Sequence, residues 1–185
     1  MAKLRRWSAY RRIERPYTRV SKYREKSYIR MSPQIKVVLF DMGNPRKEYE
    51  CAVTLHSNEW IQIRDNALES GRETANRLLE KSVGVNNYHM KVNVYPFHIL
   101  RENPLATGAG ADRFSTGMQK AFGKPIGTAA RIKEGQRLFT VSVDKMHLDV
   151  ARKALHRAGT KMPCTCRVKV VEKKVEKPIE VKAPD

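Results

Sequence analysis

The sequence predicts an α+β fold: a mixed or antiparallel β-sheet sandwich, barrel-like, with two helices on one side. Short β-branched runs outnumber the helical segments, and they do not alternate regularly with helices as in a wound parallel fold. A length of 185 residues suffices for one domain with extensions. We therefore divide the chain into a basic N-terminal arm at 1–32, an α+β domain at 33–170 and a charged, flexible tail at 171–185. The domain contains a long internal loop at about 101–125.

The first half of the domain predicts two strands and a helix. The apolar run 35–43 ends in a Gly-Asn-Pro turn and predicts a strand, and residues 51–57 predict a second one. We expect a helix capped by Ser57 or Asn58 and ending near Ser82. Its apolar positions recur near helical spacing: Ile61, Leu68, Ala75 and Leu79.

The second half predicts four strands and another helix. Residues 89–99 alternate well enough for a strand, in which Pro96 favours an edge position or a bulge. Residues 127–132 and 137–143 predict two strands joined by a tight turn, as in a hairpin. Asp144 is a suitable helix N-cap, Gly159 suits the position after the helix end, and a last strand begins at Cys166. The residues of this helix expected to face inward are Met146, Val150, Ala154, Leu155 and Ala158.

The charge balance indicates a polyanionic partner. The chain has 37 Lys and Arg against 19 Asp and Glu, a formal net charge of +18, which self-repulsion makes costly unless an anion compensates it. Half of this net charge lies in the first 30 residues, where aromatic rings stand between the cations and are available for stacking on bases or for docking. The candidate RNA-binding residues of the arm are Arg5, Arg6, Trp7, Tyr10, Arg11, Arg12, Arg15, Tyr17, Arg19, Lys22, Tyr23, Arg24, Lys26 and Arg30.

Other classes of protein find little support. The sequence has no apolar run long enough to span a membrane and no apolar signal segment at its start, so we expect a cytoplasmic protein without membrane contact. Cys51, Cys164 and Cys166 form no C-x-x-C motif, and the histidines show no metal or triad spacing. We therefore expect no metal, no cofactor and no catalytic site.

The glycine-rich segment 106–125 resembles a nucleotide-binding motif without satisfying one. Arg113 stands where the dinucleotide fingerprint needs its third glycine, and Pro125 follows Gly123 and Lys124 where a phosphate-binding loop needs Ser or Thr. Glycines, cations and aromatic residues together favour contact with RNA instead. Two alternatives stay open: a small nucleotide- or tRNA-processing enzyme that clamps its substrate with this loop, and a basic protein that coats RNA without specificity.

Four blocks also resemble a known family in order and spacing: IKVVLFDMG, YPFHILREN, GAGADRFSTGMQKAFGKPIGTAARI and the helix from Asp144 to Gly159. Over residues 33–170 the chain resembles the L-sixteen family of large-subunit ribosomal proteins, in its archaeal and eukaryotic L-ten-e branch, and most closely an archaeal member. The resemblance implies a structural constituent of the ribosome, bound to large-subunit rRNA near the tRNA channel. It also implies that the internal loop points toward the peptidyl transferase centre and supports tRNA positioning during translation.

The partners that the resemblance implies are large-subunit rRNA, including the region near 5S rRNA, aminoacyl- and peptidyl-tRNA, and neighbouring large-subunit proteins. We expect no obligate homo-oligomer. The candidate residues close to tRNA or rRNA are Arg101, Gly108, Gly110, Asp112, Arg113, Gly117, Met118, Gln119, Lys120, Phe122, Gly123, Lys124 and Arg131.

Overall fold

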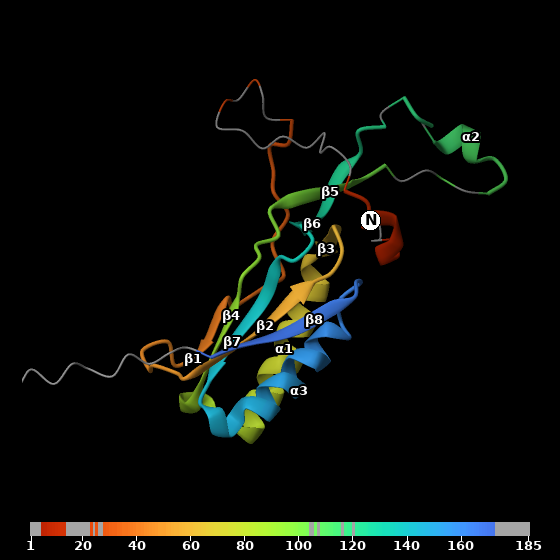
Figure 1. The fold of residues 1–185 in the computed structure, drawn as a ribbon. Coiled ribbons are helices and arrows are strands. Elements are labelled where there is room, and N and C mark those ends of the chain that lie inside the picture. The colour runs from red at the N-terminus through yellow and green to blue at the C-terminus, as the bar shows by residue number, and fades with distance from the viewer. Residues whose placement is uncertain are drawn as a thin grey trace, which may run out of the picture.

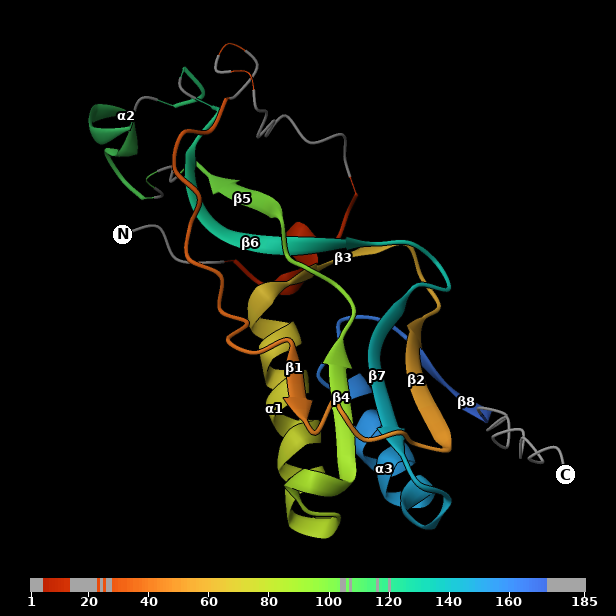
Figure 2. The same ribbon diagram turned by 90° about the vertical axis from the view of Figure 1, so that its left-hand side faces the viewer.

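The strands of this computed structural model form two antiparallel sheets (Figure 1). The structure describes residues 5–13, 23, 25, 28–103, 106, 108–115, 117–119 and 121–172. The large sheet has the order β1 (Asp41–Gly43), β4 (Tyr88–Val92), β7 (Arg137–Val143), β2 (Cys51–Ser57) and β8 (Cys166–Glu172). The small sheet has the order β3 (Ile61–Arg64), β6 (Lys124–Ile132) and β5 (His98–Glu102), and it lies across one end of the large sheet (Figure 2).

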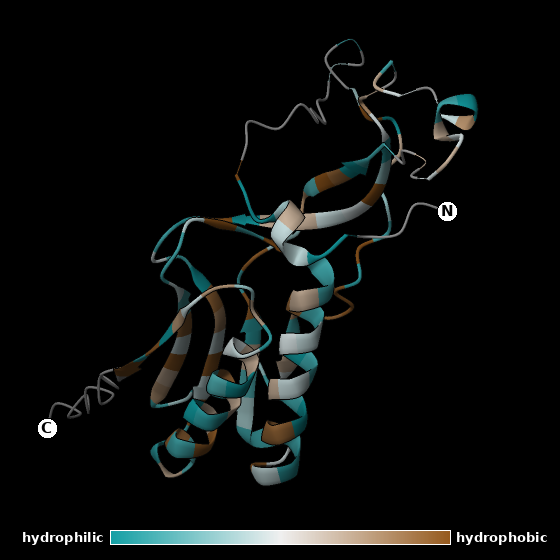
Figure 3. Ribbon diagram, turned by 90° about the vertical axis from the view of Figure 1, so that its right-hand side faces the viewer, coloured by the Kyte–Doolittle hydropathy of each residue, from teal (hydrophilic) through white to brown (hydrophobic). Residues whose placement is uncertain are grey.

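Two helices, α1 (Asp65–Ser82) and α3 (Leu148–Gly159), cover one face of the large sheet. They lie behind its strands in Figure 2 and in front of them in Figure 3, which shows the opposite side. The main core lies between this face and the helices, where Leu55 of β2, Phe139 of β7 and Leu155 of α3 are all buried. The predicted α+β class, the antiparallel pairing and the helices on one side are confirmed. The predicted barrel-like closure is wrong, because the described strands form two open sheets.

The predicted start of the first helix is wrong. Residues 61–64 form β3, which pairs with β6 through Ile61 opposite Ile132 and Ile63 opposite Ala130. The helix begins only at Asp65, and its end at Ser82 agrees with the prediction. Pairing with a strand distant in sequence has overridden the helical spacing of Ile61. The other predicted apolar positions are buried on α1: Leu68, Ala75 and Leu79.

Only the last three residues of the predicted first strand are a strand. Before β1, the backbone N–H of Lys36 donates to Asp65 Oδ2 over 3.2 Å, and that of Val38 donates to Glu69 Oε2 over 3.3 Å. Side chains of α1 therefore supply acceptors that a neighbouring strand would have supplied. Val37 between them is buried in the core.

The chain passes from one sheet to the other at two places: within the predicted strand 89–99, and at the turn of the predicted hairpin 127–143. Residues 93–97, which include Pro96, carry it from β4 in the large sheet to β5 in the small one. Residues 133–136 likewise join β6 to β7, so these two strands do not pair as a hairpin. The crossover is fixed to the end of β2, because Ser57 donates to the carbonyl of Gln136 and accepts from the N–H of Gly135.

The start of the second helix also differs from the prediction. The carboxylate of Asp144 is 2.8 Å from Lys47 Nζ and caps no N–H group, and a 3-10 turn, η4 (Lys145–His147), precedes α3. Met146 lies in this turn and is exposed, so its predicted inward position is wrong. Gly159 is the last helical residue rather than the one after it. The remaining predicted positions are buried or half-buried: Val150, Ala154, Leu155 and Ala158.

A buried carboxylate marks the junction between the small sheet and α1. Asp65 is 2% exposed. Its Oδ2 accepts from Thr128 Oγ1 on β6 over 3.0 Å, besides the Lys36 N–H, and its Oδ1 accepts from the N–H of Asn66 over 2.8 Å. A buried charge is tolerated only when such donors satisfy it, so Asp65 fixes three segments relative to one another.

We expect Asp65→Asn to lower the free energy of unfolding by about 1.5–3 kcal/mol, the usual contribution of hydrogen bonds to a charged group. The amide presents donors where the native carboxylate accepts. Urea unfolding measures the change, and Asp149→Asn is the matched control, since Asp149 occupies the first turn of α3 and is exposed. Equal effects of the two substitutions would contradict the role assigned to Asp65.

Candidate nucleic-acid interface

The arm folds back onto the small sheet. Its 3-10 turn η1 (Trp7–Tyr10) is held by Gln62 of β3, whose N–H donates to the carbonyl of Arg11 over 3.2 Å and whose Nε2 donates to that of Tyr10 over 3.1 Å. Arg64 Nη1 donates to the carbonyl of Arg5 over 2.9 Å. The strand misassigned as helix is thus the docking site of the arm.

Tyr10 anchors the arm and is not available for stacking on a base. Its ring is buried against Leu100 of β5 and Ala129 of β6. Its hydroxyl accepts from the N–H of Arg5 over 3.2 Å and donates to Glu102 Oε2 over 3.3 Å. Burial raises the pKa of this hydroxyl above its ordinary value of 10.0, which keeps the donor protonated.

Glu102 joins the arm to the root of the internal loop. Arg5 Nη2 lies 2.5 Å from its Oε1, and only 12% of the Glu102 side chain is exposed. Glu102 is the last residue of β5, where the loop begins. The sequence places Glu102 and Asp112 at the loop as acids among cations, which favours ion pairs over an acid/base dyad. Glu102 forms one with a residue distant in sequence, whereas Asp112 is exposed on the short helix α2 (Ala111–Phe114).

The two ends of the loop are locked together. Arg101 Nη1 donates to the carbonyl of Phe122 over 2.5 Å, and its guanidinium lies 3.8 Å from the centre of the Phe122 ring. Gly123 has φ +71°, and a Cβ there would lie 2.6 Å from the backbone carbonyl of Glu102. Only glycine fits this approach.

The tip of the loop presents apolar side chains to solvent. Phe114 is 87% exposed and Met118 71% exposed. Figure 2 shows α2 projecting away from both sheets. The loop is no dinucleotide site, because β5 and β6 on its two sides are antiparallel neighbours and α2 has only four residues.

Most of the other predicted contact residues lie on the surface. Those exposed in the arm are Arg5, Arg6, Trp7, Arg11, Arg12, Tyr23 and Arg30, and those exposed in the loop are Gly108, Gly110, Asp112, Arg113, Met118, Gln119, Phe122 and Lys124. Arg101, Gly117, Gly123 and Arg131 are half-buried. The candidates Arg15, Tyr17, Arg19, Lys22, Arg24, Lys26 and Lys120 lie outside the described residues.

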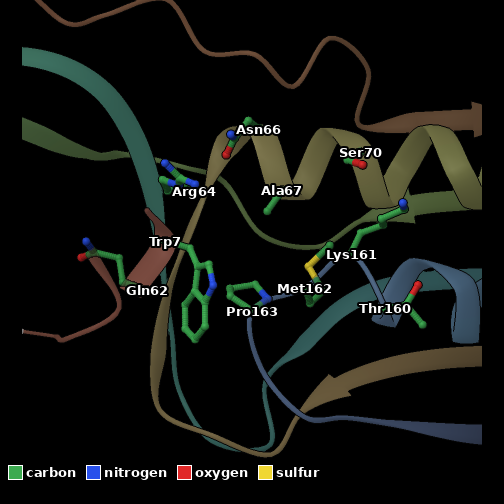
Figure 4. A pocket seen from close by; sticks show the side chains of 10 residues that line it. All are labelled: Trp7, Gln62, Arg64, Asn66, Ala67, Ser70, Thr160, Lys161, Met162 and Pro163. Carbon is green, nitrogen blue, oxygen red and sulfur yellow. The ribbon is translucent and has the colours of Figure 1, made fainter. Parts of the chain in front are cut away.

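A pocket of about 400 Å³ opens beside Trp7, between η1, the start of α1 and the turn after α3 (Figure 4). Trp7 is 45% exposed, and the guanidinium of Arg11 lies 5.4 Å from its ring. Arg64 and Lys161 contribute cations to the lining. An exposed indole beside cations can stack on a base while its phosphate is neutralised. Lys161 could not be predicted as part of this pocket, because only the fold brings the turn after α3 close to the arm.

Other kinds of site find no support among the described residues. They include no group of three or more His, Cys, Asp or Glu side chains arranged to hold a metal ion. The sulfur atoms of Cys164 and Cys166 lie 3.6 Å apart, and both cysteines are free. No helix in the described ranges is both long and apolar enough to span a membrane.

The fold and the site define a class of protein: a basic α+β domain whose cationic arm and glycine-rich loop meet at one end. The model of the family described as ribosomal protein L16p/L10e matches residues 14–169, and the chain belongs to this family. Family members are structural proteins of the large ribosomal subunit and not enzymes.

Three archaeal relatives carry the name large ribosomal subunit protein uL16. The protein of Archaeoglobus fulgidus is 46% identical over 164 residues, which cover 89% of this chain and 90% of the relative. That of Methanocella arvoryzae is 53% identical over 154 residues, covering 83% and 89%. That of Hyperthermus butylicus is 45% identical over 161 residues, covering 87% and 86%. The family resemblance inferred from the motifs is thereby confirmed.

We expect Glu102→Gln to loosen the arm, because it removes the charge that pairs with Arg5. Amide exchange of residues 5–13 should accelerate, while the free energy of unfolding falls by only about 1 kcal/mol, as for a partly exposed ion pair. Mass spectrometry of the exchanged protein measures the first effect. Glu48→Gln, at an exposed position, is the control. Unchanged exchange in the arm of the Glu102 variant would show that the ion pair does not hold it.

His98 on β5 predicts a pH dependence. Burial, together with the positive charges of Arg131 and Arg101, lowers its pKa from 6.5 to about 4. Between these values the unfolded chain binds the proton more readily, so the contribution of His98 to stability is complete above about pH 6.5 and is lost as the pH falls toward 4.

Thermal unfolding between pH 4 and 7 tests this dependence. His98→Gln should flatten the fall in stability over this range, while His156→Gln on the exposed side of α3 should leave it unchanged. An equally steep fall without His98 would assign the dependence to other groups.

Proposed function

We propose that this chain binds large-subunit rRNA near the tRNA channel and, through its internal loop, supports tRNA positioning near the peptidyl transferase centre. The proposed partners are rRNA, including the region near 5S rRNA, aminoacyl- and peptidyl-tRNA, and neighbouring large-subunit proteins. The proposed location is the cytoplasmic ribosome.

One observation carries the proposal: the arm and the loop root form a single cationic end, joined by Glu102. Arg6, Arg12 and Lys124 are exposed there, and the described residues provide no ion-pair partner for any of them. Phosphates would supply the missing negative charge, with the salt dependence that counterion release imposes. Membership of a large-subunit protein family supports rRNA as the source of these phosphates.

The exposed side chains at the loop tip favour contact with a second partner, different from the rRNA that binds the rest of the domain. Exposed apolar side chains such as Phe114 and Met118 offer no stability to the isolated fold, because little of their surface is buried. They are suited to stacking on, or wedging against, nucleotides that the loop reaches beyond the sheets. The locked root sets the direction in which the tip projects.

We expect the double variant Phe114→Ala/Met118→Ala to enter large subunits normally and to weaken their tRNA binding roughly tenfold, the loss typical of one base–aromatic contact. Sucrose gradients of low-salt lysate measure incorporation, and filter binding of labelled tRNA to the purified subunits measures the second effect. Val85→Ala/Met146→Ala, at exposed apolar positions outside the loop, is the control. Wild-type protein that stays at the top of the gradient would overturn rRNA binding, and normal tRNA binding by the loop variant would overturn the role of the tip.

A further inference from the structure

No described helix or strand covers the face of the large sheet opposite the helices, although the connection between β1 and β2 crosses its lower end (Figure 2). In Figure 2 this face is turned to the viewer, with β4, β7, β2 and β8 side by side and both helices behind them. The pairing register places Lys91, Thr140, Thr54 and Lys169 in one row across these strands. A second row contains Arg137, His56 and Arg167.

The short polar side chains of this face satisfy one another. Asn93 Nδ2 donates to Thr140 Oγ1 over 2.5 Å, His89 Nε2 donates to Asp41 Oδ1 over 3.2 Å, and Thr54 Oγ1 lies 2.9 Å from His56 Nε2. The face is therefore a network of paired short groups, from which only the long side chains project.

The long side chains are cations without partners in the described part of the chain. They are exposed, form no ion pair or side-chain hydrogen bond there, and are called the outer-face cations below: Lys91, Arg137, Arg167 and Lys169. At a strand spacing of about 4.8 Å, Lys91 and Lys169 stand about 14 Å apart across the sheet. Asp41 of β1 lies opposite Lys91 in the register, and its carboxylate is paired with His89.

A shallow hollow of about 270 Å³ lies at one end of this face. Arg167 and Lys169 line it together with His56, Ser57, Asn58 and Gly135. Glu134 is the acid in its lining. Its volume and two cations suit a phosphate group rather than an aromatic base, and the outer rows of the face carry no Phe, Tyr or Trp on which a base could stack.

We propose that this uncovered sheet face is a second RNA-binding surface, which contacts the phosphate backbone of rRNA through the outer-face cations. The inference rests on the proposed function, because it names a further part of the molecule that the same class of partner contacts. It differs from the arm and loop in kind. Without exposed aromatic rings, the face recognises the charge and shape of an RNA backbone and not its bases.

The test compares two triple variants that lose the same charge. The face variant is Lys91→Gln/Arg167→Gln/Lys169→Gln, and the control is Lys81→Gln/Arg152→Gln/Lys153→Gln on the exposed surfaces of α1 and α3. Thermal unfolding verifies that both variants fold. Filter binding to deproteinised large-subunit rRNA over a range of salt concentrations gives the slope of log affinity against log salt.

In the face variant, the magnitude of this slope should fall by roughly 0.7–0.9 for each phosphate contact removed. In the control it should fall much less. Equal losses in both variants would overturn the proposal, because they would reflect overall charge alone. An unchanged slope in the face variant, with weakened binding to polyglutamate, would overturn it in favour of an acidic protein partner. Wild-type protein that binds unrelated RNA as tightly as large-subunit RNA would instead overturn the proposed function itself. Glu134→Gln provides an independent check, since removal of the acid from the hollow should strengthen binding.

Discussion

The carboxylate of Asp65 accepts hydrogen bonds from three parts of the chain, and the placement of the small sheet depends on it. The donors come from the segment before β1, from Thr128 on β6 and from the first turn of α1. All three must be in position at once for the buried charge to be satisfied. The arm and the internal loop are both attached to the small sheet, so the same carboxylate indirectly orients every proposed RNA contact at that end of the molecule.

The sequence predicts well those elements whose local residue pattern favours the same structure as their contacts with distant parts of the chain. β2 and β7 are apolar runs that become adjacent strands, and Leu68, Ala75 and Leu79 follow the helical period that α1 uses. β3 could not be predicted, because Ile61 and Ile63 acquire their strand partners only from β6. The change of sheet at 133–136 has no local signal either, since it depends on hydrogen bonds to Ser57.

The candidate site shows the same division. Charge and composition predict a cationic arm and an exposed, glycine-rich loop. They do not distinguish Tyr10, which is buried and docks the arm, from Trp7, which borders a pocket and is partly exposed. The role of Glu102 requires the ion pair with Arg5. The outer-face cations are spread over β4, β7 and β8, so only the register of the sheet reveals that they form one surface.

Strand β8 ends the large sheet, and an end strand offers unpaired backbone groups to any chain of similar shape. Arg167 and Lys169 stand on this strand, where a second copy aligned edge to edge would bring like charges together. The same two cations thus disfavour edge-to-edge pairing of the free protein, and in the proposed complex the RNA that covers them would take over this role.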